Sequence, residues 1–392
     1  MKTEYRKLGE IIELIDERNK SLVTSEVLGI SIDKEFMPSV ANTIGTDLSK
    51  YKLIKKNTFA CNPMHVGRDE RLPVALYKGE EPVIVSPAYF MFKVKNKNQV
   101  LPDFLMLLFR REDFDRNCWF RTDGSVRGGI TWEALCEIEL PIPAIEVQQK
   151  IVNTYNAITK RIQLKQKINE NLEKTAQCLF DKNFKEYNKF YEKEDLKTLP
   201  ADWKYALVGD FCKDNIKSIS SSDEVKEILY LDTGSITNNK IDELQIIPER
   251  DGFPSRAKRI VYDNDIVFST VRPNLQHYGI IRKPAKNMIV STGFSVLHNN
   301  SDRVSNEFLY MWITNDATLS FLQSIAENSV STYPSINSDD IMNIKIIIPT
   351  DNILSELNEV FRKTFLMIDY NNQEITKMQE LKQLVISRIS GM

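Results

Sequence analysis

The middle of the chain changes from a mixed pattern to a helical one. Before about residue 140, short apolar runs alternate with polar turns, whereas residues 144–190 repeat apolar positions every three or four residues. This spacing predicts an amphipathic helix. Its apolar stripe is expected at Ile151, Tyr155, Ile158 and Ile162 and, after a shift of phase, at Leu164, Ile168, Leu172, Ala176 and Leu179.

A second amphipathic helix is predicted at residues 350–392. Its stripe keeps a spacing of roughly 3.5 residues, which is typical of a coiled-coil seam. The stripe consists of Leu357, Phe361, Thr364, Ile368, Asn371, Ile375, Met378, Lys382, Val385 and Ile389. Polar residues within such a seam weaken packing but fix the register. We expect the two helices to pair antiparallel as a rod, each spanning roughly 45–60 Å at about 1.5 Å per residue; two ordinary core helices are the alternative.

The rest of the chain has the pattern of α+β structure. Runs rich in valine, isoleucine, phenylalanine and tyrosine predict strands, and turns containing proline or glycine separate them. The clearest strands are expected in "PVIVSPAYFMFKV", "DIVFSTV", "MIVSTGFSVL" and "NIKIIIP", and "PDFLMLLFRREDF" predicts a helical segment. The strands do not alternate regularly with helices, which argues against a doubly wound parallel sheet.

The chain resembles itself at a period of roughly 200 residues, and such a repeat indicates architecture. Seven pairs of segments occur in the same order: "LGEII" and "VGDFC", "VLGIS" and "ILYLD", "NTFAC" and "DIVFS", "VIVSPAYFMF" and "MIVSTGFSVL", "DFLMLLF" and "EFLYMWI", "GSV" and "NSV", and "LPIPAI" and "IIIPTD". We therefore expect two similar globular domains related by a pseudo-two-fold axis, with the helix pair separating them. The predicted boundaries are 1–143, 144–190, 191–349 and 350–392.

Composition places this chain among ordinary globular proteins. It has 392 residues, 42% hydrophobic and 27% charged, and at this length two or more domains are expected. The start has no apolar signal segment, and the five cysteines form no C-x-x-C pair. We therefore expect a reduced, cytoplasmic protein without a disulfide framework or a zinc site.

No catalytic motif is visible. There is neither a phosphate-binding nor a dinucleotide-binding glycine loop, and the three histidines have no metal-ligand spacing. "NPMH" at 62–65 superficially resembles the catalytic loop of amino-methyltransferases, but it lacks the second proline and the aromatic residue. We interpret it as a turn that ends a strand, and we expect a binding protein rather than an enzyme, with no cofactor in this chain.

The sequence resembles the DNA-specificity subunits of type I restriction–modification systems. The segments that carry the resemblance are "LPIPAIEVQQKIVNTYNAITKRIQLKQKINENLEKTAQCLF" at 140–180, "LPADWKYALVGD" at 199–210 and "IVFSTVRPN" at 266–274. The second long helix departs from the family pattern, because it lacks the Glu-x-Gln-Gln signature. The resemblance implies two target-recognition domains that each read one half of a split site in double-stranded DNA. It also implies helices that dock two modification subunits, which would carry S-adenosylmethionine, and further restriction or translocase subunits.

Candidate DNA contacts follow from side-chain chemistry. Arginine can make two hydrogen bonds to guanine, and asparagine or glutamine can make two to adenine. Lysines are candidates for phosphate contacts, which position a protein without specifying a sequence. The candidates are Lys50, Lys52, Lys55, Lys56, Arg68, Arg71, Arg121, Ser125 and Arg127 in the first domain, and Arg272, Asn274, Gln276, His277, Tyr278, Ser331, Thr332 and Tyr333 in the second.

Two other function classes remain open from the sequence. One is a restriction or methyl-transfer enzyme that acts alone, which binding of S-adenosylmethionine by the isolated chain would support. The other is a coiled-coil adaptor that binds only proteins. DNA affinity that falls steeply with salt would argue against the adaptor.

Overall fold

The computed structural model describes residues 4–40, 45–64, 66–122, 128–187, 199–220, 225–249, 252–329 and 333–389. The chain forms two compact units. Unit 1 consists of residues 1–164 and 374–392, and unit 2 of residues 165–373. The predicted α+β class is confirmed, because each unit combines mostly antiparallel sheets with helices.

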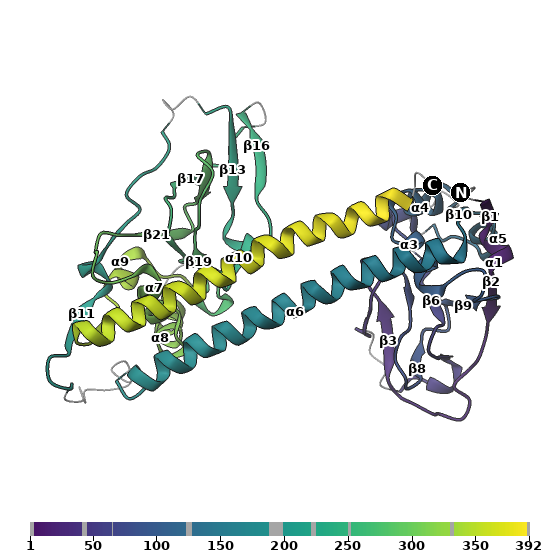
Figure 1. Cartoon of the computed structure of the whole chain (residues 1–392), viewed down its shortest axis with the longest axis horizontal. Coiled ribbons are helices and arrows are strands. Elements are labelled where there is room, and N and C mark those ends of the chain that lie inside the picture. The colour runs from purple at the N-terminus through teal and green to yellow at the C-terminus, as the bar shows by residue number, and fades with distance from the viewer. Residues whose placement is uncertain are drawn as a thin grey trace. The chain divides into compact units, whose positions relative to one another are not determined.

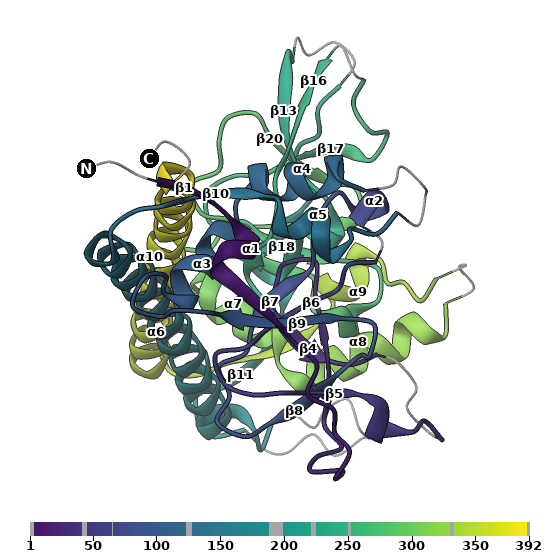
Figure 2. The same cartoon turned by 90° about the vertical axis from the view of Figure 1, so that its right-hand side faces the viewer.

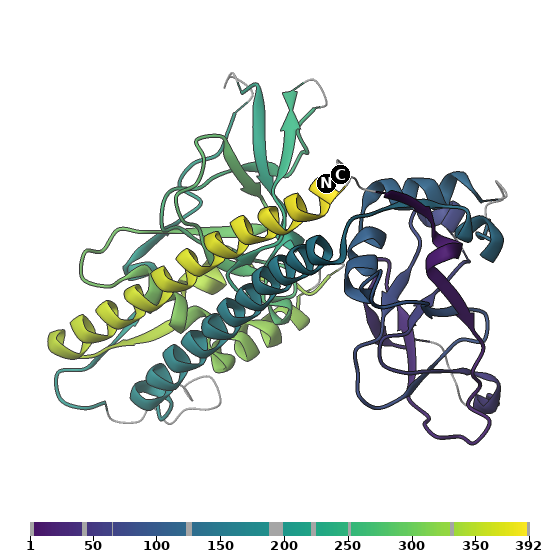
Figure 3. The same ribbon diagram turned by 45° about the vertical axis from the view of Figure 1, so that its right-hand side comes forward.

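Among the described residues, unit 1 contains three sheets and a group of short helices; most of this unit is the purple-to-blue part of the chain in Figure 3. Its strands are β1 (Glu4–Lys7), β2 (Ile12–Ile15), β3 (Val27–Ile30), β4 (Phe36–Pro38), β5 (Lys52–Ile54), β6 (Phe59–Cys61), β7 (Val74–Leu76), β8 (Val83–Val85), β9 (Phe90–Val94) and β10 (Glu139–Ile142). Its short helices are α1 (Leu8–Ile11), η1 (Leu48–Lys50), α2 (Val66–Asp69), α3 (Pro102–Phe109), α4 (Glu112–Phe120) and α5 (Trp132–Cys136).

Unit 2 contains the corresponding elements and one additional hairpin. Its strands are β11 (Lys204–Leu207), β12 (Cys212–Asp214), β13 (Glu227–Leu231), β14 (Ile236–Thr237), β15 (Lys240–Ile241), β16 (Gln245–Pro248), β17 (Ala257–Ile260), β18 (Ile266–Ser269), β19 (Tyr278–Ile280), β20 (Met288–Ser291), β21 (Phe294–Asn299) and β22 (Lys345–Ile348). Its short helices are η3 (Val208–Asp210), η4 (Thr233–Ser235), η6 (Pro273–Leu275), α7 (Asn306–Thr314), α8 (Asp316–Glu327) and α9 (Ser338–Met342).

The two units have the same sheet topology. The order β2-β9-β6-β7 in unit 1 corresponds to β12-β21-β18-β19 in unit 2, and β4-β3-β8-β5 corresponds to β16-β13-β20-β17. Each unit also has one pair that joins its first strand to its last, β1 with β10 and β11 with β22. Even the single parallel pair recurs, β3 with β8 and β13 with β20. The predicted duplication is therefore confirmed at the level of topology, and β14–β15 is an insertion in unit 2.

Strand alternation explains how each unit builds two apolar layers. In β18, Ile266 and Phe268 face the helices, whereas Val267 faces the second sheet. In β6, Phe59 and Cys61 face the helices and Ala60 faces the second sheet. Successive side chains of a strand point to opposite faces, so three consecutive apolar residues in a strand can supply both layers. A central sheet covered on both faces results in each unit.

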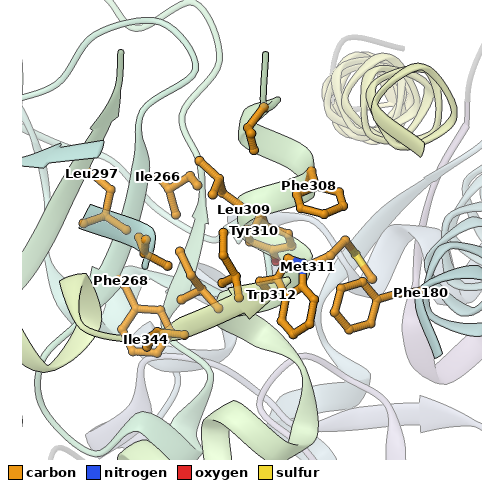
Figure 4. Packing of buried hydrophobic residues seen from close by; sticks show 14 of the residues in the cluster. Phe180, Ile266, Phe268, Leu297, Phe308, Leu309, Tyr310, Met311, Trp312 and Ile344 are labelled. Atoms are coloured by element: carbon orange, nitrogen blue, oxygen red, sulfur yellow. The ribbon is translucent and has the colours of Figure 1, made fainter. Parts of the chain in front are cut away.

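Two long helices complete the fold. They are α6 (Ile145–Phe184) and α10 (Asp351–Ile389), which lie side by side and antiparallel (Figure 1 and Figure 2). In unit 1, the Lys382 ammonium of α10 lies 4.8 Å from the centre of the Tyr155 ring of α6. In unit 2, Phe180 of α6 packs against Trp312 of α7, with ring centres 4.9 Å apart (Figure 4). Each helix thus contributes to the cores of both units.

One part of the predicted stripe on α6 is wrong. Leu164 and Ile168 are 56% and 46% exposed, whereas Asn169 is 8% exposed. The buried positions instead continue in steps of seven from Ile162 through Asn169 to Ala176. The stripe has no shift of phase. Asn169, a polar residue, occupies the buried position that the apolar pattern assigned to its neighbour Ile168.

The start of each long helix is tied to its unit by an amide side chain. Gln148 lies within the Glu-x-Gln-Gln signature; its Oε1 accepts a hydrogen bond from the Leu101 N–H at the start of α3, over 2.9 Å. In unit 2, Oδ1 of Asn358 accepts the corresponding hydrogen bond from the Ser305 N–H at the start of α7, over 3.0 Å. The second helix therefore makes the same connection without the signature, from an amide about one turn further along.

Candidate nucleic-acid interface

The candidate residues of the two units lie on corresponding connections. In unit 1, the β6–β7 connection meets the segment after α4, where the Ile130 N–H donates to the Pro63 carbonyl over 3.1 Å. In unit 2, the β18–β19 connection meets the segment after α8, where the Ile336 N–H donates to the Thr270 carbonyl over 2.8 Å. We name these surfaces edge 1 (residues 62–64, 66–73, 121–122 and 128–130) and edge 2 (residues 270–277 and 333–336).

Edge 2 holds Arg272 in a defined backbone conformation. Its φ of 50° lies in the left-handed region, which costs an L-residue roughly 1–2 kcal/mol. The conformation is held on both sides, because the Arg272 N–H donates to the Pro334 carbonyl over 2.9 Å and Val271 bridges Ser335. The exposed guanidinium lies 5.3 Å from the centre of the Tyr333 ring. This cation–π contact restricts the side chain without using its hydrogen-bond donors.

Asn274 and Gln276 extend the same turn. The Asn274 N–H donates to Oε1 of Gln323, over 3.2 Å, and the Gln276 carbonyl accepts from the Asn238 N–H over 2.8 Å. Both side chains are exposed, and within the described ranges neither side-chain amide makes a hydrogen bond. The turn therefore combines a fixed backbone with free amide groups suited to base edges.

His277 and Tyr278 differ from these residues. Nδ1 of His277 lies 2.7 Å from the Ile236 carbonyl, so this half-buried ring joins the turn to the β14–β15 hairpin. Tyr278 is 3% exposed and stacks on Phe268, with ring centres 5.4 Å apart. The prediction of Tyr278 as a DNA contact is wrong, because its strand position points the ring into the core.

Edge 1 is also basic, but two of its arginines have acidic neighbours. Nε of Arg68 donates to Asp69 over 2.6 Å, and Arg71 lies 3.7 Å from Asp33. Both arginine side chains are more than half exposed, and such pairs contribute little to stability. Their guanidinium groups can therefore exchange these partners for DNA at small cost. Arg121 lies at the end of α4, and its Nη1 donates to Oδ1 of Asn117 over 3.4 Å.

The predicted turn at "NPMH" is confirmed for its described part. β6 ends at Cys61, and the Met64 N–H donates to Oδ1 of Asn62 over 3.1 Å. The predicted contacts Ser125, Arg127, Ser331 and Thr332 lie outside the described residues, as do His65, "GSV" and part of "NSV". Tyr333 is 58% exposed.

Sequence reasoning missed two exposed apolar sites beside these edges. Trp119 and Phe120 are 45% and 83% exposed at the end of α4, directly before Arg121. Leu275 is 46% exposed within the turn of edge 2. Exposed aromatic residues can stack on bases or insert between them, and an aromatic pair next to an arginine is a signal that the sequence did contain.

The basic run at Lys50–Lys56 surrounds β5. Its exposed lysines each have a carboxylate partner: Lys50 lies 3.6 Å from Asp47, Lys55 lies 2.5 Å from Glu17, and Lys56 pairs with Glu80. The prediction of Lys52 as a phosphate contact is wrong. Its side chain is 10% exposed, its Nζ donates to the Tyr89 carbonyl over 2.6 Å, and burial lowers the pKa of the ammonium.

The described helices include none that could cross a bilayer, because each is too short or too polar.

Known proteins share this sequence pattern and this fold. A family model described as "Type I restriction modification DNA specificity domain" matches residues 2–174 and again residues 200–384. The chain is 26% identical over 183 residues to the type I restriction enzyme HindI specificity subunit of Haemophilus influenzae, an alignment that covers 47% of this chain and only 39% of that protein. It is 24% identical over 309 residues to the MjaIX specificity subunit of Methanocaldococcus jannaschii, covering 75% of this chain and 69% of that one.

A solved structure shares the fold over the full length. The S subunit of a type I restriction–modification system from M. genitalium superposes with a TM-score of 0.61 at 12% identity, covering 99% of this chain and 96% of that one. The duplicated arrangement of strands and helices is therefore a known fold.

Proposed function

Since the chain belongs to the type I restriction–modification DNA specificity family and contains two copies of its domain, we propose that it recognises a bipartite site in double-stranded DNA. Each unit reads one half-site through its edge. The observation that carries this proposal is the topological equivalence of edge 1 and edge 2: Arg68 and Arg71 lie on the β6–β7 connection of unit 1, and Arg272, Asn274 and Gln276 lie on the corresponding β18–β19 connection of unit 2. A chain that reads two half-sites needs two similar reading surfaces.

The edges have the chemistry for base recognition. Arg272, Asn274 and Gln276 present donors and acceptors on a fixed turn, and Arg68, Arg71 and Arg121 present guanidinium groups. Lys50, Lys55 and Lys56 make only weak phosphate contacts that help to orient unit 1 on the duplex, because each has a carboxylate partner. A good bidentate contact contributes about 1–3 kcal/mol of discrimination, so a few such side chains suffice to define a half-site.

The chain acts as the recognition subunit of a larger assembly. We propose that α6 and α10 dock two modification subunits, which bind S-adenosylmethionine and transfer the methyl group, and that restriction or translocase subunits join them. Because α6 and α10 each extend through both units, their length sets the spacer between the half-sites. Inserting helical residues near Arg161, with a matched insertion in α10, should change the spacer and leave both half-sites unchanged.

Sequencing of methylated DNA tests the proposal directly. Cells with the gene should carry a bipartite methylated motif that is missing from cells without it. Replacing residues 1–140 by those of a relative should change one half of the motif only. A change in both halves would contradict separate reading by the two units. If cells without the gene still carried every methylated motif, the proposed function would be contradicted. Binding of S-adenosylmethionine by the isolated chain would favour an enzyme that acts alone.

A further inference from the structure

β17 of unit 2 and β5 of unit 1 occupy corresponding positions. Each is the last strand in the order of its sheet, and each pairs outward with a short segment. In unit 1, the Leu53 N–H donates to the Glu17 carbonyl over 2.8 Å; in unit 2, the Ile260 N–H donates to the Lys217 carbonyl over 3.0 Å. Glu17 and Lys217 are therefore structural counterparts of opposite charge.

The charges around the two strands also differ. Around β5, the cations have carboxylate neighbours: Arg18 and Lys52 share Asp16, Lys50 has Asp47, and Lys55 has Glu17. Around β17, the cations are Lys217, Arg256, Lys258 and Arg259, and none of them makes an ion pair within the described ranges. Nη1 of Arg259 is buried without a hydrogen-bond partner among the described residues. The β17 side therefore presents three exposed cations, Lys217, Arg256 and Lys258, without an ion pair among the described residues, whereas Asp214 lies near the half-buried Arg259.

The start of β17 is connected to edge 2 through backbone hydrogen bonds. The Arg256 carbonyl accepts a hydrogen bond from the Thr292 N–H, and the neighbouring Gly293 carbonyl accepts one from the Thr270 N–H, each over 2.8 Å. Thr270 opens the turn that contains Arg272. The short turn between β20 and β21 is therefore hydrogen-bonded both to the start of β17 and to the turn that contains Arg272. β17 lies beside β20 in Figure 2. The side chains of Lys217, Arg256 and Lys258 are exposed.

We propose that Lys217, Arg256 and Lys258, here called the β17 strip, bind the phosphate backbone of the duplex read by edge 2. This inference rests on the function proposed above and assigns it a site. A cation without a carboxylate neighbour attracts phosphate with its full charge, whereas the negative charge of a neighbouring carboxylate offsets that of a lysine and repels phosphate. Unit 2 therefore carries more of the salt-dependent binding free energy than the lysines around β5, although the sequence singled out those lysines.

The test measures how binding depends on salt. The full chain, co-purified with its modification subunit, is titrated with a fluorescent duplex of random sequence at several KCl concentrations. The variant Arg256→Gln/Lys258→Gln is compared with Lys50→Gln/Lys55→Gln, which removes the same charge from the counterpart strand. We expect the magnitude of the slope of log K against log [KCl] to decrease by about one to two for the β17 variant, and by clearly less for the β5 variant. The methylated motif should remain the same in both.

Two results would overturn the inference: an unchanged slope in the β17 variant, or an equal decrease of the slope in both variants. Because the substituted side chains are exposed, thermal unfolding should match the wild type and confirms that each variant is folded. If the wild-type assembly bound no duplex at all, the proposed function itself would fail. Normal wild-type binding with an unaffected β17 variant would overturn only the assignment of the strip.

Discussion

Asn371 of α10 donates a hydrogen bond from its side-chain Nδ2 to Oδ1 of Asn169 of α6, over 2.8 Å, and both residues are buried. The remaining amide groups are also satisfied. Lys165 donates to Oδ1 of Asn371, and Asn169 donates to Oδ1 of Asn372, each over 2.8 Å. A satisfied polar network between two helices favours one alignment over others, because shifting either helix would leave buried amides unpaired.

Removing one partner of this network should cost more than removing both. Asn371→Leu leaves Oδ1 of Asn169 buried without its donor, so we expect a loss of about 1–3 kcal/mol in the free energy of unfolding. Asn169→Leu/Asn371→Leu places two apolar residues in contact and should recover much of that loss. Urea unfolding of the wild type, both single variants and the double variant measures the coupling. A double variant that loses the sum of the single losses would contradict the network.

The corrected stripe on α6 predicts a contrast between two residues two positions apart. Ile162 is 7% exposed and Leu164 is 56% exposed. We expect Ile162→Ala to destabilise the protein by about 2–4 kcal/mol, because it removes buried methyl groups and leaves a cavity. Leu164→Ala should change the free energy of unfolding by no more than about 0.5 kcal/mol. Thermal or urea unfolding of the two variants decides between this stripe and the phase shift expected from hydrophobicity alone.

The sequence allowed the duplication to be predicted because corresponding strands kept their apolar runs. The described pairs, such as "DFLMLLF" and "EFLYMWI", fall on equivalent elements, here α3 and α7. It failed where burial depends on tertiary pairing. Asn169 is buried because Asn371 faces it; the pattern of α10 placed Asn371 in its seam, but the pattern of α6 alone does not show that Asn169 lies opposite. Lys52 and Tyr278 lie in strands, where a shift of one residue exchanges exposed and buried faces. The β17 strip could be identified only from the structure, because its cations differ from those around β5 only in lacking ion pairs with carboxylates.

The cysteines offer a test of both cores. Burial raises the pKa of Cys61 and Cys118 well above the usual range and the pKa of Cys212 to about 12, whereas Cys178 is exposed and Cys136 is half-buried. Only a thiolate attacks a disulfide reagent, so raised pKa values suppress reaction near pH 8. We expect one fast label at Cys178, a slower one at Cys136, and three further labels only after denaturation. Rapid labelling of Cys61 or Cys212 in the native protein would contradict the cores described here.

Because the backbone of Arg272 is left-handed, glycine can replace this residue without destabilising the fold, so its role in recognition can be tested separately from its effect on stability. Glycine adopts this conformation without steric cost, so Arg272→Gly relieves roughly 1–2 kcal/mol of strain and loses a cation–π contact with Tyr333 of about 0.5–1 kcal/mol. We expect the free energy of unfolding to stay equal or rise slightly. Methylation should at the same time become degenerate at one position of one half-site.

A matched control is available in the same unit. Asn238 also has a positive φ, of 44°, and it holds the turn through its backbone N–H, so Asn238→Gly should relieve strain and leave the motif unchanged. In the other unit, Arg71→Gln should relax only the opposite half-site. If Arg272→Gly altered neither half, or altered both, the turn of edge 2 would not be a base-reading element. A stable protein that methylates a relaxed motif is the outcome that distinguishes lost recognition from lost folding.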